Sequence, residues 1–382
     1  MLVWRQLRRL LSGKWRHKAQ PAAYAAGTLQ AQGHRRALQD LRGRIIKAAR
    51  LHVCGKPFQI DDVPVPEVKE GQTLVKVVAS YVCSSDIGLV KRERPWAKMP
   101  MIPGHNVTGS IEKVGPNVAG FKKGDMVAVY GAWGCGECEF CRQGDEQFCD
   151  PRKWVGFGPD GGYAQYLLVP EQRHLIKIGE LSPYDVAPLL DAGLTAYRAI
   201  KQALPLPHPG AFIEILGIGN IGYYAVQIAK VLSPTSEVIA VDVLQDRLQL
   251  AAGLGSDHQI LADSSAVKDI REISGADGVS VIVDTVGSDA TLAIAAQTAG
   301  KRAVIALVGL AGGRIPKLPG ECRVANSVWG TISEMNELLA LYAEGKIKCQ
   351  IKRFALDSIN EVFQLIQTKQ LQEQAVITPQ VT

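Results

Sequence analysis

The chain of 382 residues contains no apolar run that approaches the roughly 18 residues a membrane helix needs, so we expect no membrane span. Beyond the first 46 residues it also has no internal repeat and no low-complexity tract. Hydrophobic residues make up 47% and charged residues 21%, which indicates a soluble globular protein. The length exceeds that of one ordinary core and predicts two domains.

Acidic residues are almost missing from residues 1–46, where ten Lys/Arg accompany a single acid, Asp40. The rest of the chain has 33 basic and 36 acidic residues and gives no electrostatic reason to expect nucleic acid. The basic head also lacks the apolar core of a secretory signal. We expect a disordered extension. The alternatives are an upstream stretch that an overlong gene model adds, an organelle-targeting segment, or a segment that attaches the protein to a surface.

Five of the eight cysteines stand in motif-like positions, and Cys54, Cys322 and Cys349 are scattered. Metal thiolates and free thiols persist in a reducing compartment. The cysteine pattern therefore predicts a cytoplasmic protein.

Two different sequence patterns follow one another along the chain. From Ile46, short strand-like runs such as TLVKVVASYV and DMVAVYG are broken by Gly, Pro, Asn and Asp, which predicts a β-rich first domain. From about Thr195, strand and helix patterns alternate, beginning with AFIEIL and NIGYYAVQIAKVL. This alternation predicts an α/β fold with a doubly wound parallel sheet. The tail KRFALDSINEVFQLIQ is expected to return to the first domain.

The strongest local motif is CGECEFCRQGDEQFC, in which cysteines are spaced C-x2-C-x2-C-x7-C. Four thiolates on so short a loop can form the closed tetrahedron of a structural zinc ion. An iron–sulfur cluster and ordinary thiols are the alternatives. The predicted ligands are Cys135, Cys138, Cys141 and Cys149.

A glycine-rich turn, LGIGNIG, follows the strand pattern AFIEIL and opens a helix pattern. Gly217, Gly219 and Gly222 allow a tight turn and a close backbone approach to a pyrophosphate at the helix N-terminus. Asp242, twenty residues after Gly222, can accept the hydroxyls of an adenosine ribose and would repel a 2′-phosphate. The pattern predicts NAD rather than NADP. The alternative is a glycine-rich turn in a sheet that binds no nucleotide.

A third set is dispersed: Cys83 in CSSD, His105 in GHN, and Asp191 in the mostly apolar run APLLDAGLTAYRAI. A thiolate, an imidazole and a carboxylate can supply three protein ligands to zinc and leave the fourth position for substrate. Each residue also has a simpler explanation. Cys83 suits a core thiol, His105 a loop histidine, and Asp191 the N-cap of the helix GLTAYRAI.

Taken together, these motifs resemble the zinc-containing medium-chain alcohol dehydrogenases from about Lys47 to the C-terminus. GHNVTGSIEKVGPNV is similar to the family signature G-H-E-x2-G-x5-G-x2-V and departs from it at Asn106. The resemblance implies a GroES-like catalytic domain (47–191 and 347–382) and a Rossmann NAD-binding domain (192–346). It also implies a homo-oligomer, dimer or tetramer, that acts on a small alcohol, ketone or aldehyde without nucleic acid or membrane.

The resemblance implies that Asp191 stands where the family has a cysteine as third ligand of a catalytic zinc, as in some bacterial NAD-dependent secondary-alcohol dehydrogenases. Two Zn²⁺ per chain are then expected, one catalytic and one structural. Ser85 is similar to the hydroxyl that accepts the alcohol proton, and Asp86 to the carboxylate that orients His105. The implied cofactor-binding residues are Thr195, Gly217, Gly219, Asn220, Ile221, Gly222, Asp242, Arg247, Val308, Gly309 and Leu310.

Three residues depart from the family pattern. Asn106 replaces a glutamate, Gly88 stands where some relatives have a relay histidine, and Gln374 replaces a basic residue that meets the cofactor phosphate. We expect altered ligand exchange at the metal, proton release through ribose and water, and modest affinity for NAD.

The substrate pocket is expected to have apolar walls from Trp96, Leu310 and Trp329. The resulting prediction is reversible, zinc-dependent hydride transfer between a secondary or primary alcohol and NAD. A polyol or threonine dehydrogenase, a zinc-free quinone reductase and a non-catalytic nucleotide-binding relative are the alternatives.

Overall fold

The computed structural model describes residues 43–91, 98–150, 153–204 and 210–380. Residues 45–382 form one compact unit, and its first strand begins at Ile45. Of the basic head expected at residues 1–46, residues 1–42 lie outside the described residues, and Ile45 and Ile46 belong to β1 rather than to an extension. The predicted pocket residue Trp96 also lies outside the described residues, in 92–97.

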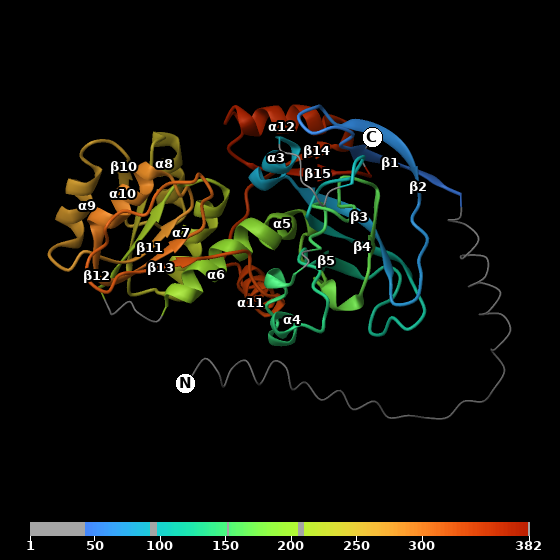
Figure 1. The fold of residues 1–382 in the computed structure, drawn as a ribbon, viewed down its shortest axis with the longest axis horizontal. Coiled ribbons are helices and arrows are strands. Elements are labelled where there is room, and N and C mark those ends of the chain that lie inside the picture. The colour runs from blue at the N-terminus through green and yellow to red at the C-terminus, as the bar shows by residue number, and fades with distance from the viewer. Residues whose placement is uncertain (1–42, 92–97, 151–152, 205–209, 381–382) are drawn as a thin grey trace, which may run out of the picture. The chain divides into compact units, whose positions relative to one another are not determined.

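A six-stranded parallel sheet forms the second half of the fold, with strand order β10-β9-β8-β11-β12-β13 (Figure 1). Its central strands β8 and β11 are almost wholly buried, as expected when both faces of a parallel sheet are covered by helices. They are β8 (Phe212–Leu216), β9 (Glu237–Asp242), β10 (His258–Leu261), β11 (Val279–Asp284), β12 (Ala299–Leu307) and β13 (Arg323–Asn326).

Helices cover both faces of this sheet. Ile213 and Ile215 pack into one core with α6 and α7, whereas Ile282 packs into another with α9 and α10. This arrangement confirms the predicted doubly wound α/β fold. The helices of this half are α6 (Leu194–Ala203), α7 (Asn220–Leu232), α8 (Gln245–Gly253), α9 (Ala266–Ser274), α10 (Asp289–Thr298) and α11 (Ile332–Ala343).

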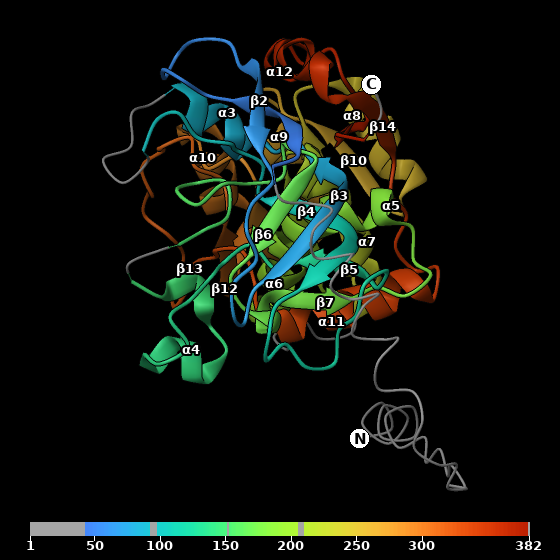
Figure 2. The same cartoon turned by 90° about the vertical axis from the view of Figure 1, so that its right-hand side faces the viewer.

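The first half is built on a second, mostly antiparallel sheet of order β14-β15-β3-β4-β5-β7, with β6 also paired to β3 (Figure 2). Its strands are β3 (Thr73–Tyr81), β4 (Asn106–Val114), β5 (Met126–Val129), β6 (Tyr166–Val169), β7 (Leu175–Lys177), β14 (Ile351–Ala355) and β15 (Gln374–Thr378). β1 (Ile45–Arg50) and β2 (Gln59–Pro64) form a separate antiparallel pair. The predicted β-rich first half is confirmed.

Shorter elements connect these strands. The helices are α3 (Ser84–Lys91), α4 (Glu139–Gln143), α5 (Pro183–Pro188) and α12 (Ile359–Gln367). The single turns are η1 (Glu146–Phe148), η2 (Gln172–His174), η3 (Leu189–Gly193) and η4 (Leu356–Ser358). In the part of the chain that the structure describes, no helix combines the length and apolar character needed to cross a membrane.

The C-terminal tail returns to the first sheet, as its sequence predicted. β15 pairs antiparallel with β3, and β14 pairs parallel with β15. The boundaries of the expected domains stay a prediction, because residues 45–382 behave as one compact unit.

Candidate functional site

Three side chains from distant parts of the chain converge between the two sheets. Cys83 follows β3, His105 precedes β4, and Asp191 lies in η3, a turn of π-helix between α5 and α6. One ligand atom from each lies within 4.8 Å of the other two. His105 Nε2 is 3.1 Å from Asp191 Oδ2, close to the separation of about 3.3 Å expected for nitrogen and oxygen ligands on a tetrahedral metal. The set fits a metal ion with three protein ligands.

Asp86, fully buried on α3, holds two of these groups in place. Its Oδ1 accepts a hydrogen bond from His105 Nδ1 at 2.9 Å, and its Oδ2 accepts the backbone N–H of Cys83 at 3.0 Å. The Tyr163 hydroxyl donates to the same Oδ2 at 2.8 Å. When Nδ1 keeps the proton that it donates to Asp86 and Nε2 gives up its own, the Nε2 lone pair becomes available to a metal.

The charges in this cluster favour a divalent cation. Burial, reinforced by Asp191, raises the pKa of the Cys83 thiol to about 11. Burial by itself would lower the pKa of His105, but the charge of Asp86 and the hydrogen bond to Asp191 raise that pKa well above its usual value of 6.5. A cation that accepts sulfur, nitrogen and oxygen donors would balance the thiolate and carboxylate together.

The capping interpretation of Asp191 is wrong. The chain runs from α5 through the π-turn into α6, and Gly193 occupies the N-cap position of α6 without any side-chain cap bond. Asp191 Oδ1 instead accepts the Thr195 hydroxyl at 3.2 Å. Its side chain keeps 16% of its surface exposed, so the carboxylate is not fully enclosed. Single π-turns of this kind are frequent at functional sites.

Two further predicted residues lie at the cluster. Ser85 Oγ is 3.4 Å from His105 Nε2, so its hydroxyl lies beside the atoms that can hold a metal. Thr195, expected to bind the cofactor, is buried, and its hydroxyl donates to Asp191. Both therefore lie next to the ligand atoms.

The four predicted thiols of the CGECEFCRQGDEQFC loop also converge. Their sulfur atoms lie within 4.8 Å of one another, and those of Cys135 and Cys141 are 3.9 Å apart. Tetrahedral thiolates about 2.3 Å from zinc stand about 3.8 Å apart. The backbone N–H groups of Glu137 and Cys138 donate to Cys135 Sγ and lower the pKa of that thiol to about 6. The geometry fits a closed tetrahedral metal site; all four positions are occupied by protein.

The glycine-rich turn lies between β8 and α7, and its glycines are required for different reasons. Gly217 has φ +85°, and a Cβ on Gly222 would overlap the Gly217 carbonyl oxygen. Gly219 has φ −80°, which any residue can adopt, and a Cβ there would meet no atom within 4 Å. Gly219 thus keeps open space beside the α7 N-terminus, where a pyrophosphate would approach. Asn220 and Ile221 begin α7.

Asp242 ends β9 beside this turn. Its Oδ2 accepts the Ile218 N–H at 2.7 Å and its Oδ1 accepts the Leu244 N–H at 2.9 Å. Each carboxylate oxygen can accept more than one hydrogen bond, so ribose hydroxyls can still be bound. The site fits the adenosine end of NAD.

The remaining cofactor candidates are spread more widely. Val308 and Gly309 follow β12, and their N–H groups donate to the Asp284 carbonyl; Leu310 is 91% exposed. Arg247 Nη1 and Nη2 donate to the carbonyls of Gln372 and Leu371, each at 3.3 Å, so Arg247 is engaged with the segment that leads into β15.

The residues that depart from the family pattern occupy distinct places. Asn106 is fully buried, and neither amide atom has a hydrogen-bond partner among the described residues. A Cβ on Gly88 would meet no atom within 4 Å. Gln374 is buried, and its Oε1 accepts the Tyr224 hydroxyl at 2.6 Å.

Trp329, a predicted pocket wall, is buried against the ligand set. Its ring centroid is 5.8 Å from that of His105 and 5.0 Å from that of Trp154. Phe157 also packs on His105, at 4.8 Å. Sequence reasoning missed Tyr163 and Phe157, because neither belongs to a motif and only folding brings them to His105 and Asp86.

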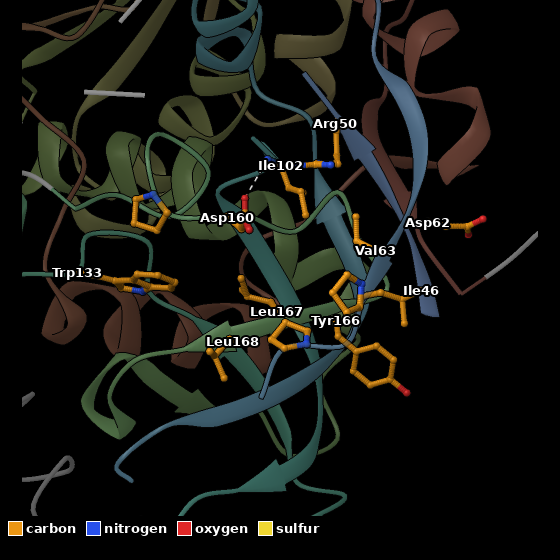
Figure 3. A pocket seen from close by; sticks show the side chains of 13 residues that line it. Ile46, Arg50, Asp62, Val63, Ile102, Trp133, Asp160, Tyr166, Leu167 and Leu168 are labelled. Carbon is orange, nitrogen blue, oxygen red and sulfur yellow. Dashed lines mark hydrogen bonds between the residues drawn. The ribbon is translucent and has the colours of Figure 1, made fainter. Parts of the chain in front are cut away.

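A cavity of about 520 Å³ opens elsewhere on the first half of the fold, between the β1–β2 pair, β6 and the loops that carry Ile102, Trp133 and Asp160 (Figure 3). Its wall is mostly apolar, with Ile46, Ile102 and Leu167 among the lining residues. None of the predicted site residues lines it, so it is separate from the metal and nucleotide sites.

Comparisons with known proteins agree with this geometry. Family models described as "Alcohol dehydrogenase GroES-like domain" and "Zinc-binding dehydrogenase" match residues 69–180 and 220–344. An NAD-dependent alcohol dehydrogenase of Sulfurisphaera tokodaii is 34% identical over 87% of this chain and 100% of its own length. A D-arabinose 1-dehydrogenase (NADP(+)) of Saccharolobus solfataricus is 32% identical over 87% of this chain and 97% of its own. The crystal structure of the alcohol dehydrogenase from Aeropyrum pernix matches with a TM-score of 0.81 and 35% identity, over 87% of this chain and 100% of that chain.

Proposed function

Because the chain belongs to the zinc-containing medium-chain alcohol dehydrogenases, we propose that Cys83, His105 and Asp191 hold a catalytic zinc at which alcohols and NAD are interconverted with ketones or aldehydes and NADH. The enzyme is an NAD-dependent oxidoreductase. The convergence of three ligand atoms within 4.8 Å carries the proposal. A second zinc in the lobe of Cys135, Cys138, Cys141 and Cys149 completes the proposed pair of metals per chain.

Zinc and NAD would each supply chemistry that does not depend on this particular chain. Zinc supplies Lewis-acid polarisation that lowers the pKa of an alcohol hydroxyl, and NAD accepts the hydride. The residues of this chain position and protect these groups. Asp86 orients the His105 ring, and Ser85 Oγ lies close enough to the ligand atoms to accept the hydroxyl proton of the alcohol. Trp329 and Phe157 pack on the His105 ring and exclude water from that side.

Recognition of the cofactor rests on the glycine turn and Asp242. Gly219 leaves room for the pyrophosphate, and Asp242 is placed to accept ribose hydroxyls and to repel a 2′-phosphate. NAD is therefore proposed as the preferred cofactor. Leu310 and Trp329 are proposed pocket walls that suit hydrophobic alcohols.

A second candidate is oxidation of a sugar or polyol, which is favoured by the identity of 32% to a D-arabinose 1-dehydrogenase (NADP(+)). The buried aromatic rings at His105 favour apolar alcohols over such substrates. Asp242 also weighs against NADP.

The test is a substrate panel of 2-propanol, longer secondary alcohols, primary alcohols, threonine, D-arabinose and a polyol. NADH or NADPH formation is measured with each cofactor, with and without a zinc chelator, together with the zinc content. We expect chelator-sensitive oxidation of apolar alcohols with NAD and close to two zinc ions per chain. A metal-free protein that binds NAD but oxidises none of the alcohols would refute the proposal.

Replacing Asp191 separates the ligand from a merely structural carboxylate. Asp191→Ala should lose one zinc per chain and nearly all activity, while the four-cysteine lobe keeps its metal. Asp191→Cys, which restores a ligand of the same charge, should retain both metals. Equal zinc content in Asp191→Ala and the unaltered protein would remove Asp191 from the ligand set.

Three wider features are also proposals. The division into 47–191 with 347–382 and 192–346 is supported by the membership of β14 and β15 in the first sheet. A homo-oligomer, dimer or tetramer, is tested by light scattering on the purified enzyme. The cytoplasmic compartment is supported by the free thiols and is tested by cell fractionation.

A further inference from the structure

Trp329 has a backbone conformation that needs an explanation. Its φ is +49°, in the left-handed region that bulky side chains rarely adopt, and its side chain is buried. Such a conformation persists only where the surrounding contacts determine it. Two sets of contacts meet at this residue.

The first set joins Trp329 to the three-ligand cluster. Its Nε1–H donates to the Leu190 carbonyl at 2.8 Å, and Leu190 directly precedes Asp191 in the π-turn. Its ring meets His105 edge-to-face at 5.8 Å. The ring also lies against the backbone of Gly131, where a Cβ would come within 2.5 Å of it. One side chain thus contacts the ring of one ligand and the turn that carries another.

The second set joins the turn after Trp329 to the four-cysteine lobe. Tyr130 donates its hydroxyl to the Gly330 carbonyl at 2.6 Å, and that hydroxyl is 3.4 Å from Gln147 Oε1. Gln147 lies between the third and fourth cysteines of the lobe. Both Tyr130 and Gln147 are buried.

Ion pairs of Arg198 connect the same two regions as the Tyr130–Gly330 hydrogen bond. Arg198 on α6 donates to Glu334 Oε2 at 2.9 Å and to Asp145 Oδ1 at 3.1 Å. Glu334 is the capping-box residue whose carboxylate accepts the Thr331 N–H at the start of α11. The Arg198 guanidinium also lies 5.7 Å from the ring centroid of Phe148, another lobe residue. Two sets of contacts therefore connect the lobe to the turn 330–331, and they are joined where Gln147 Nε2 donates to Asp145 Oδ1 at 3.0 Å.

We propose that Trp329 is a positioning residue for the Cys83–His105–Asp191 set and that the four-cysteine lobe fastens it there through Tyr130 and Arg198. The lobe then has a role beyond stability. It fixes the position of Trp329, and Trp329 in turn positions the π-turn and the His105 ring. The inference rests on the proposed metal ligand set.

The test uses the full chain with zinc in the four-cysteine lobe and Co²⁺ in the three-ligand site. The visible d–d bands of Co²⁺ report its ligand geometry, and competition with a chelator measures its dissociation constant. Trp329→Phe keeps an aromatic ring but removes the hydrogen bond to Leu190. It should shift the cobalt bands and weaken binding of Co²⁺ by about 10- to 100-fold, the usual effect of losing a residue that orients ligands.

Tyr130→Phe tests the connection at a distance, because it removes only the hydroxyl that bonds to Gly330. It should shift the cobalt bands in the same direction, by less. Tyr224→Phe is the matched control, since it removes another buried hydroxyl, which donates to Gln374, and it should leave the bands unchanged.

Unchanged bands and affinities within twofold of the unaltered protein in both Trp329→Phe and Tyr130→Phe would overturn the proposal. If Trp329→Phe does not fold, the comparison of Tyr130→Phe with Tyr224→Phe decides alone. Cobalt bands that Asp191→Ala leaves intact would instead overturn the ligand set, and this inference with it. The two failures are thereby distinguishable.

Discussion

At the scale of single residues, Glu214 is an unusual member of the parallel sheet. It lies in β8 with no exposed surface, and its Oε2 accepts the Thr298 hydroxyl at 2.7 Å. Among the described residues, its Oε1 has no hydrogen-bond partner. Burial, with a smaller contribution from Asp284, raises the pKa of the Glu214 carboxyl from 4.5 to about 7. Below about pH 7 the buried carboxyl is therefore mainly in its neutral form.

This shift predicts the pH dependence of stability. Between pH 4.5 and about 7 the folded chain keeps the Glu214 proton and the unfolded chain loses it, so the free energy of unfolding falls as the pH rises. The loss amounts to about 3 kcal/mol above pH 7, at 1.4 kcal/mol for each pKa unit. Glu214→Gln should be more stable than the unaltered protein at pH 8, and the two should converge near pH 4.5.

Urea unfolding at pH 5, 6, 7 and 8 checks this expectation. Thr298→Val is the control, because it removes the hydroxyl donor and leaves the carboxyl titrating. A difference between Glu214→Gln and the unaltered protein that does not change with pH would contradict it.

Asp191 shows what could be predicted from a single residue. Its charge in an apolar run indicated a functional or capping role, because a buried carboxylate needs compensation. Composition and spacing favoured a helix cap, whereas resemblance favoured a metal ligand. The π-turn, which places the carboxylate beside His105 and Thr195, could not be predicted from residues 187–200.

At the scale of elements, glycine has two different roles in the turn between β8 and α7: Gly222 allows close packing, and Gly219 leaves space open. Gly222→Ala would force its Cβ onto the Gly217 carbonyl, whereas Gly219→Ala would enter open space. We expect Gly222→Ala to lower the free energy of unfolding by about 1–3 kcal/mol, as overpacking does. Gly219→Ala should fold normally and bind NAD at least about tenfold more weakly, because the methyl group occupies the approach of the pyrophosphate.

Thermal unfolding and fluorescence titration with NADH measure the two effects. Each variant is the control for the other. If Gly219→Ala binds NADH as the unaltered protein does, the open space is not the cofactor's approach.

The elements themselves were largely predictable. The pattern NIGYYAVQIAKVL coincides with α7, and EVIAVD coincides with β9. The first segment is long enough to show a helical pattern, and the second is a short, almost continuous apolar run typical of a buried strand, so local hydrophobic patterning indicates both structures. The short strands of the first sheet were recognised only as a β-rich region, since their pairing joins segments as distant as β3 and β15.

At the scale of the whole molecule, the two proposed metals differ in their surroundings. The three-ligand site offers three protein ligand atoms, and one of them belongs to the Asp191 carboxylate, whose side chain is 16% exposed. The lobe would hold its proposed metal with four thiolates. A chelator should therefore remove about half of the zinc first, with loss of activity and little change in melting temperature.

Removal of the remaining zinc should destabilise the protein, because the lobe packs against α6 and the α11 N-terminus through Arg198. Zinc content, activity and melting temperature are followed during stepwise chelation. Simultaneous release of both metals with unfolding would contradict the expected order.

The sequence by itself determined the features that depend on short distances along the chain: the four-cysteine lobe, the glycine turn with Asp242, and the alternation of strands and helices. Local geometry is sufficient there, since the participating residues share one loop or one βαβ unit. Only the tertiary structure decided how His105 meets Asp191, 86 residues away, and how Trp329 reaches Leu190 across 139 residues. Contacts of that range depend on the packing of whole sheets, which leaves no mark in the local pattern.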